Sequence, residues 1–260
     1  MVKYFYNSDE VAVMPTEINE QSFRSEIVRV FSKNKLGAML SEAKVTKLLL
    51  LTERMLTENE KYNLTAITEP SKIILHHYAD CAALAARMPK GARIADVGCG
   101  AGFPTLPMAI LREDISVVGI DSTAKRIAYV SESAKMLSLD NVSAVAMRAE
   151  DGGKNAEYRE RFDIVTARAV AELRILAELC LPMVRIGGKM IAMKGKNAEF
   201  ELAGAKRAIA ILGGRSTTVE DITLSNDTEV LTHPLITIEK KERTPATYPR
   251  PYAQISKKPL

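Results

Sequence analysis

The sequence has little of what marks membrane, secreted or zinc-binding proteins. The apolar run Leu48–Leu51 is short and lies between charged residues, whereas a membrane helix needs about 20 apolar residues. Residues 1–10 are too polar for a signal peptide. The three cysteines, Cys81, Cys99 and Cys180, are far apart and form no CxxC pair, which disfavours a disulfide framework or a zinc site. Reduced thiols fit a cytoplasmic protein, and we expect neither a metal nor a membrane as partner.

A large excess of one charge is also missing. The formal net charge is +4, and 26% of the residues are charged. That balance is ordinary for a soluble protein and is by itself weak evidence for an anionic partner. With 260 residues, 47% of them hydrophobic, the chain can bury a sizeable core in one large domain, alone or with a smaller attachment.

The first third of the chain has apolar residues at the spacing expected for helices. Ser22 is a candidate N-cap for a helix that begins at Phe23, and Ser41 is a candidate for a longer one. Pro70 suits the first turn of a third helix.

After Gly91 the pattern changes to short apolar segments that alternate with helical ones. The predicted strands are 93–97, 116–121, 142–147, 162–167 and 189–194, and residues 235–239 also resemble a strand. The predicted helices are 104–112, 123–138, 172–186 and 198–212. This alternation predicts a doubly wound α/β fold, in which helices cover both faces of a parallel sheet. We therefore expect three parts: a flexible extension over 1–20, a helical segment over 21–88, and an α/β domain over 89–260 that ends in a basic, proline-rich tail.

The first predicted strand ends in a glycine-rich turn, Asp96–Gly102, with glycines at three alternate positions. Such a turn favours a ligand site, because backbone without Cβ atoms can approach a ligand closely. The dinucleotide fingerprint G-x-G-x-x-G is absent, since its last position falls on Phe103 or Thr105. The pattern D-x-G-x-G-x-G resembles instead the S-adenosylmethionine loop of Rossmann-like methyltransferases. That cofactor has no pyrophosphate, but it has a cationic sulfonium and an amino acid end.

In a sheet of this kind, ligands bind at the carboxyl ends of the strands. Asp96 is placed to hold the ammonium group, directly or through water. Asp121 ends the second predicted strand, where it can accept hydrogen bonds from ribose hydroxyls, cap the next helix, or do both. Ala149 and Glu150 follow the third strand at the adenine position. Cys99 is interpreted as a small residue that fills the turn rather than as a nucleophile.

An ordered set of motifs is more specific than the glycine turn alone. The set comprises Asn63–Ile67, His77, Asp80, Asp96–Pro104, Asp121–Arg126, Arg148–Glu150, Ala167–Ala171, Met193–Gly195, Thr244–Arg250 and Lys257–Leu260. Over residues 40–260 it resembles the bacterial small-subunit (16S) ribosomal RNA guanine-N7 methyltransferases, the RsmG or glucose-inhibited division protein B family. The chain departs from that pattern at Thr105, where the family usually has glycine, and at Tyr252–Ile255, where many members have Gly-x-Pro.

The resemblance implies a class I S-adenosylmethionine-dependent methyltransferase with a Rossmann-like, seven-stranded, mostly parallel sheet and an N-terminal helical addition. Together with the turn, it gives the expected cofactor-binding residues: Asp96, Gly98, Gly100, Gly102, Phe103, Asp121, Ser122, Thr123, Ala149, Glu150 and Arg168. The implied reaction moves a methyl group from S-adenosylmethionine to N7 of a guanine in 16S ribosomal RNA and leaves S-adenosylhomocysteine.

Guanine N7 carries no proton, so its methylation needs no general base, and we assign no residue as acid or base. The enzyme's main task is then to align the two reactants. Arg168 and Lys194, at the ends of the fourth and fifth predicted strands, are the expected positioning residues. The expected RNA contacts are Arg148, Lys194, Lys196, Arg250, Lys257 and Lys258. Between Lys240 and Leu260 there are six Lys or Arg residues against one acid, Glu242.

The sequence leaves two points open. His77 and Asp80 fall near one face of the third predicted helix. Either both residues close the pocket, or Asp80 only orients His77. The acceptor is RNA by resemblance, and the alternatives are a small-molecule or protein acceptor, or a non-catalytic nucleotide-binding module. The expected partner is ribosomal RNA or the small ribosomal subunit, and we expect a monomer.

Overall fold

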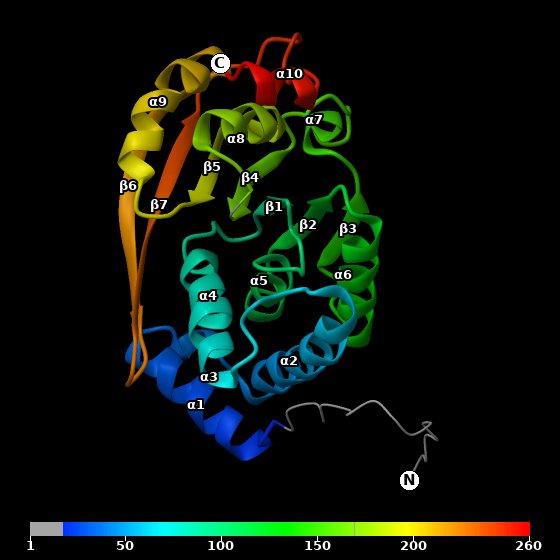
Figure 1. Ribbon diagram of the computed structural model, residues 1–260, viewed down its shortest axis with the longest axis vertical. Coiled ribbons are helices and arrows are strands. Elements are labelled where there is room, and N and C mark those ends of the chain that lie inside the picture. Colours follow the sequence, from blue (N-terminus) through cyan, green and yellow to red (C-terminus); the bar gives the residue numbers. More distant parts are fainter. Residues whose placement is uncertain (1–17, 169) are drawn as a thin grey trace.

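The computed structural model describes residues 18–168 and 170–260. A seven-stranded sheet crosses the molecule in the order β3-β2-β1-β4-β5-β7-β6 (Figure 1). The strands are β1 (Arg93–Val97), β2 (Ser116–Asp121), β3 (Val142–Ala146), β4 (Phe162–Arg168), β5 (Val184–Met193), β6 (Gly214–Ser225) and β7 (Val230–Lys240). The first five strands pair in parallel, while β7 is antiparallel to both β5 and β6. The predicted fold class is confirmed.

Helices cover both faces of this sheet. They are α1 (Glu20–Lys33), α2 (Glu42–Tyr62), α3 (Pro70–Ile73), α4 (Asp80–Ala85), α5 (Thr105–Leu111), α6 (Ala124–Met136), α7 (Ala149–Gly152), α8 (Leu173–Cys180), α9 (Ala198–Ile211) and α10 (Tyr252–Lys257). A π-helix joins α3 to α4, and short 3₁₀ turns lie at Gly37–Met39 and Leu181–Met183. Within the described ranges, no helix combines the length and apolar character that crossing a bilayer requires.

The order of the strands places a crevice at the carboxyl end of β1. The chain leaves β1 to β2 on one side and returns to β4 on the other. Val97, the last residue of β1, pairs with Ile120 of β2 and with Ala167 of β4. In an open α/β sheet, ligands bind where the strand order reverses in this way.

The N-terminal helices pack against the sheet and share its core. Phe31, Leu48 and Tyr78 are fully buried in one continuous apolar cluster with Ile94 of β1 and Leu106 of α5. The helical segment therefore covers one face of the sheet, and α8 and α9 cover the other (Figure 1).

The start of α1 differs from the prediction. Asn19, not Ser22, is the N-cap, because its Oδ1 atom accepts a hydrogen bond of 2.9 Å from the Ser22 amide. The helix begins at Glu20, so only residues 1–17 of the expected flexible extension lie outside the described residues. Ser41 caps α2, and Pro70 is in the first turn of α3, as predicted.

Several element boundaries near the sheet's antiparallel edge were also wrong, and one strand was not predicted. The helix expected over 172–186 ends at Cys180, and residues 184–186 belong to β5. β7 starts at Val230 rather than 235, and the sequence pattern alone did not locate β6. The expected proline-rich tail contains a helix, α10.

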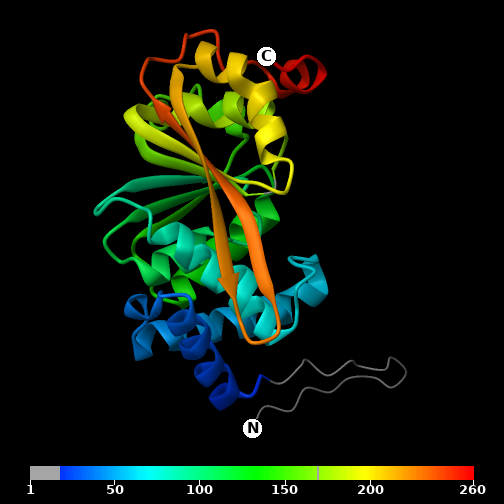
Figure 2. The same cartoon turned by 90° about the vertical axis from the view of Figure 1, so that its left-hand side faces the viewer.

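β6 and β7 form a long hairpin that runs from the level of α9 to the level of α1 (Figure 2). Near its turn, the Asn34 side chain accepts a hydrogen bond from the Ser225 amide at 2.9 Å and donates one to the Ser225 carbonyl at 2.8 Å. Lys33 donates to the carbonyl of Asn226 at 2.7 Å. The hairpin thus fastens the N-terminal helices to the far edge of the sheet.

Candidate active site

The glycine turn after β1 has a backbone that favours glycine. Gly98, Gly100 and Gly102 all have positive φ, at 73°, 55° and 84°, a region that residues with a Cβ rarely adopt. Space is also limited at Gly98, where an added Cβ would lie 2.6 Å from Cγ2 of Val170. Conformation and close packing therefore explain why the sequence alternates glycines here.

A pocket of about 390 Å³ opens beside this turn, at the carboxyl ends of β1 to β4. The predicted cofactor residues that line it are Gly98, Asp121, Ser122, Thr123, Ala149, Glu150 and Arg168. Arg148, expected as an RNA contact, lines it as well. Residues that are far apart in the sequence thus meet at the switch point of the sheet.

The remaining predicted cofactor residues, Asp96, Gly100, Gly102 and Phe103, do not line the pocket. They shape its surroundings. The Gly100 amide donates to Asp121, and Gly102 leaves room for Leu106, whose Cδ1 would lie 2.7 Å from an added Cβ. Cys99 is buried, and burial raises the pKa of its thiol, so it fills the turn as interpreted from the sequence.

Several residues of the pocket were not predicted to bind the cofactor, although some of them lie within the motifs of the resemblance. They are Val97, Ile120, Arg126, Met147, Val170, Leu179 and Tyr252. Val97 and Ile120 are the strand residues next to predicted ones, so their position in the strands could have revealed them. Tyr252 comes from α10 in the tail, and no local pattern connects it to the glycine turn.

Asp121 presents a carboxylate that the protein backbone holds in place. Its Oδ2 accepts from the Gly100 amide at 3.1 Å, and its Oδ1 accepts from the Thr123 amide at 2.8 Å. Arg126 of α6 approaches Oδ2 at 3.6 Å. The N-cap position of α6 is Thr123, so Asp121 braces the start of the helix from the strand end while lining the pocket.

Asp96 lies beneath the turn and is 1% exposed. Thr105 Oγ1 donates a hydrogen bond of 2.6 Å to Asp96 Oδ2. The other oxygen, Oδ1, has no hydrogen-bond partner among the described residues. Burial raises the pKa of this carboxyl to about 6, against the effect of the Thr105 hydrogen bond. An unpaired acceptor of this kind favours a cationic or hydrogen-bond-donating ligand group.

A second group of polar side chains lies next to Arg168. His77 stacks on Phe103 with ring centroids 4.4 Å apart, and its Nε2 is 3.2 Å from Thr65 Oγ1. Burial, followed by the nearby Arg168, lowers the pKa of His77 to about 3, so the ring is neutral. Asp80 contacts Arg168 and His233. Orienting His77 is therefore not the role of Asp80.

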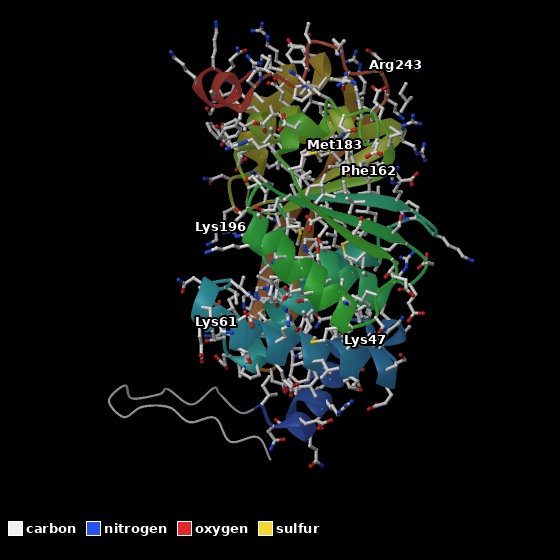
Figure 3. All side chains as sticks on the ribbon, turned by 90° about the vertical axis from the view of Figure 1, so that its right-hand side faces the viewer. Lys47, Lys61, Phe162, Met183, Lys196 and Arg243 are labelled. Carbon is white, nitrogen blue, oxygen red and sulfur yellow. The ribbon has the colours of Figure 1, made fainter. Side chains whose placement is uncertain are left out.

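The basic residues expected to contact RNA fall into two groups. Lys194 is 9% exposed and pairs with Glu201 at 2.6 Å, while Arg250 pairs with the fully buried Glu178 at 2.6 Å. The exposed residues are Arg148, Lys196, Lys257 and Lys258. Figure 3 shows Lys196 on the same side of the molecule as Lys61, which belongs to α2.

Among the described residues, no three His, Cys, Asp or Glu side chains form a group that could hold a metal ion. The candidate site is therefore a pocket with Asp121 on its wall and Arg168 at the end of β4, and Asp96 is buried below the glycine turn beside it. Such an arrangement is suited to binding and orienting a nucleoside-like ligand with a cationic end.

Comparison with known proteins identifies a family that matches most of this chain. Residues 44–230 match the family described as GidB: rRNA small subunit methyltransferase G. A ribosomal RNA small subunit methyltransferase G from Clostridium perfringens is 42% identical over 229 residues, which cover 87% of this chain and 95% of that protein. Its counterpart from Desulfitobacterium hafniense is 40% identical over 236 residues, covering 90% and 97%.

Solved structures extend the likeness to the fold. A SAM-dependent O-methyltransferase from Thermotoga maritima superposes with a TM-score of 0.50 at 13% identity, covering 74% of this chain and 72% of that one. This likeness concerns the fold alone. The sequence matches go further, and by them the chain belongs to the GidB family, rRNA small subunit methyltransferase G.

Proposed function

We propose that this protein transfers a methyl group from S-adenosylmethionine to N7 of a guanine in small-subunit (16S) ribosomal RNA. The observation that carries the proposal is the pocket at the end of β1, in which Asp121 and Arg168 meet the glycine turn in a chain of the GidB family. The proposed setting is the cytoplasm, with the protein acting as a monomer on ribosomal RNA or the small subunit.

The residues of the pocket fit the two ends of this cofactor. Asp121 is placed to accept hydrogen bonds from the ribose hydroxyls, and Ala149 and Glu150 border the adenine position after β3. Asp96 does not line the pocket, but its unpaired Oδ1, below the glycine turn, is the proposed partner for the ammonium group, directly or through water. When bound, the cofactor supplies an electrophilic methyl group on a cationic sulfonium.

The acceptor chemistry needs orientation rather than proton transfer. Guanine N7 offers a lone pair and has no proton to remove. His77 is buried and has a pKa of about 3, and its neutral ring fits a site that stacks and shapes. Holding two reactants in line contributes several kcal/mol to such reactions, up to about 7–11 in favourable cases. Arg168, at the end of β4, is the proposed residue that orients the acceptor.

Lys194 has a supporting place in this proposal. Its ammonium group donates to the carbonyl of Ala171 at 2.7 Å and pairs with Glu201, so it holds Ala171 next to α9. Arg250 likewise serves the fold through Glu178. The proposed RNA contacts are then the exposed residues, namely Arg148, Lys196, Lys257 and Lys258.

The geometry of RNA limits the form of the substrate. N7 lies on the major-groove edge of guanine, and the major groove of an A-form helix is too deep and narrow for side chains. We therefore expect the target guanine in a loop, in a distorted helix or in an incompletely assembled particle.

A transfer assay tests the proposal. Purified protein is incubated with S-adenosylmethionine labelled in the methyl group and with small subunits or 16S RNA, and the label in RNA is counted. Gly98→Asp should abolish transfer, because the new side chain needs the space of Val170 at a φ of 73°. Gly91→Asp is the matched control, since Gly91 also has positive φ but no atom lies within 4 Å of its added Cβ. Absence of label in both RNA substrates with wild-type protein would refute the RNA acceptor.

The position of the product can be mapped chemically. Borohydride and aniline cleave RNA at N7-methylguanine, so a strain without this protein should lose one cleavage stop in 16S RNA. Deleting residues 244–260 is a poor alternative test. Tyr252 lines the cofactor pocket, so the deletion would impair methyl transfer to any acceptor.

A further inference from the structure

Arg168 lies between the cofactor pocket and a buried carboxylate. Arg168 is one of the residues that line the pocket. Its NH1 atom is 3.6 Å from Oδ2 of Asp80, whose side chain is 6% exposed, and its guanidinium lies 5.8 Å from the ring centre of Phe103. Asp80 begins α4, so this contact joins the helical layer to the end of β4.

Asp80 has a second partner from a distant part of the chain. The Nε2 atom of His233 in β7 lies 2.5 Å from Asp80 Oδ1. The hydrogen bond to Asp80 raises the pKa of His233, while burial and Arg168 act in the opposite direction. Asp80 from α4, Arg168 from β4 and the backbone at Pro234 are the groups that set the charge of this imidazole. Both oxygens of Asp80 are therefore engaged, one by the hairpin and one by the pocket arginine.

The charge of Asp80 matters for the proposed reaction. Methylation of N7 moves a positive charge from the sulfonium onto the guanine. A guanidinium beside the acceptor would oppose the arrival of that charge, because like charges repel strongly where water is excluded. A carboxylate on the far side of Arg168 offsets this repulsion. The same ion pair, at 3.6 Å, attracts the guanidinium toward α4 and so restrains the position of the arginine side chain.

We infer that Asp80 and His233 are positioning residues for methyl transfer, which hold Arg168 at the acceptor end of the pocket and balance its charge. The inference rests on the proposed function, because it takes Arg168 to face the acceptor base. It makes the β6–β7 hairpin part of the active site, although no hairpin residue lines the pocket.

A purely structural role for the contact is the competing explanation. The same hairpin provides a matched control, because His76 of the π-helix pairs with Glu229 beside β7 at 2.9 Å. This second link also joins the helical layer to the hairpin, but it does not touch Arg168. If the His233–Asp80 pair only fastens the hairpin, breaking either link should have similar consequences.

The test compares Asp80→Asn, His233→Gln and His76→Gln in the full-length chain. Methyl transfer to small subunits gives kcat and KM, and calorimetry gives the affinity for S-adenosylmethionine. We expect Asp80→Asn to lower kcat by about 10- to 100-fold, because a displacement of about 1 Å caused by a distant change can cost up to about 100-fold. His233→Gln should lower kcat less, because its amide still donates to Asp80. The loss of kcat should exceed any loss of cofactor affinity in either variant, because Arg168 also lines the cofactor pocket. His76→Gln should keep the wild-type kcat and cofactor affinity.

A second measurement does not depend on activity. The chain has only three histidines, so proton NMR resolves each ring and the single variants assign them. The pKa of His233 should lie above its ordinary value in the wild type and fall in Asp80→Asn. It should rise in Arg168→Gln, because the opposing charge is removed.

The outcomes separate this inference from the proposed function. If wild-type protein methylates no RNA, the proposed function fails, whatever the NMR shows. If the wild type is active but Asp80→Asn and His76→Gln have equal kcat, the positioning role is wrong. If the pKa of His233 in Asp80→Asn equals its pKa in the wild type, the inference is also overturned, because the two side chains would then not be coupled.

Discussion

Thr105 and Asp96 form a buried hydrogen bond beneath the glycine turn, with Thr105 Oγ1 2.6 Å from Asp96 Oδ2. Thr105 is fully buried and Asp96 is 1% exposed. From the resemblance of the sequence, we expect the family pattern to have glycine at the position of this threonine. In this chain it supplies the one side-chain donor to a carboxylate whose other oxygen has no partner among the described residues. The departure at Thr105 therefore acts directly on the charge of a proposed cofactor ligand.

Asp96→Asn should stabilise the ligand-free protein at pH 7 and weaken cofactor binding. Burial raises the pKa of Asp96 to about 6 from an ordinary value of 3.8. The stability linked to this carboxyl is therefore fully present below pH 3.8 and is lost as the pH rises through about 6. A shift of this size corresponds to a loss on the order of 3 kcal/mol. Thermal unfolding of both proteins from pH 4 to 8 should show the advantage of the variant growing up to about pH 6 and then levelling off.

Asp163→Asn is the control, because the pKa of Asp163 is shifted in the opposite direction to that of Asp96. Although burial raises the pKa of Asp163, hydrogen bonds from the Arg93 amide and the Arg185 side chain lower it overall. Its stabilising effect is present above the ordinary pKa and is lost as the pH falls. The variant should therefore be less stable than wild type at pH 7. A pH-independent difference for Asp96→Asn would contradict the assigned ionisation.

Gly98→Ala should impair cofactor binding, and Val170→Ala should restore part of it. The added methyl would lie 2.6 Å from Cγ2 of Val170, and shortening that side chain removes the overlap. The left-handed backbone would still cost about 1–2 kcal/mol, so rescue should be incomplete. Calorimetry with S-adenosylmethionine on both single variants and the double variant measures the coupling. Strictly additive effects would show that the two residues do not share this space.

The sequence was sufficient for the parts of the fold that local patterns determine. The strand that ends at Val97 is buried over its last four residues, and the glycines after it have the positive φ that the turn requires. Gly98, Asp121 and Glu150 each follow or end a predicted strand, and parallel strands bring their carboxyl ends to one edge. Their convergence in one pocket could therefore be predicted from the sequence alone.

The antiparallel edge was less accessible to prediction. β6 is an edge strand in which polar residues such as Thr217 and Asp221 are frequent, so it lacks the apolar run of a buried strand. It is held by its pairing with β7, a tertiary contact. Tyr252 and His233 reach the site region through the tail and the hairpin, and no local spacing records such contacts.

Charge also proved ambiguous in sequence. Lys194 and Lys257 are both basic residues within motifs of the resemblance, but the first pairs with Glu201 and the second is exposed. The position of an acidic partner in space separates the two cases: Glu201 is in the next helix, α9, and it reaches Lys194 through the turn between β5 and α9.

Breaking the link between Arg250 and Glu178 should destabilise the fold and reduce cofactor affinity together. The Arg250 guanidinium donates to both oxygens of Glu178, which is fully buried. Removing one partner of a buried pair costs about 3–5 kcal/mol, because it leaves an uncompensated charge. Arg250→Ala should therefore lower the free energy of unfolding by about 3–5 kcal/mol. It should also displace Tyr252 from the pocket wall. Arg243→Ala is the matched control, since that tail arginine is 83% exposed. Loss of stability with unchanged cofactor affinity would contradict a role for the tail in the pocket.

Lys257→Ala with Lys258→Ala should weaken RNA binding in a salt-dependent manner and leave cofactor affinity unchanged. Both side chains are exposed at the end of α10. Each phosphate contact that is lost should reduce the slope of log affinity against log salt by about 0.7–0.9. Titration of 16S RNA fragments between about 50 and 200 mM salt measures this slope. Lys194→Ala should behave differently, because its pairing with Glu201 predicts lower thermal stability with little change in slope. If the double variant keeps the wild-type slope, the tail lysines do not contact phosphates, and the RNA-binding surface must depend on Arg148 and Lys196 instead.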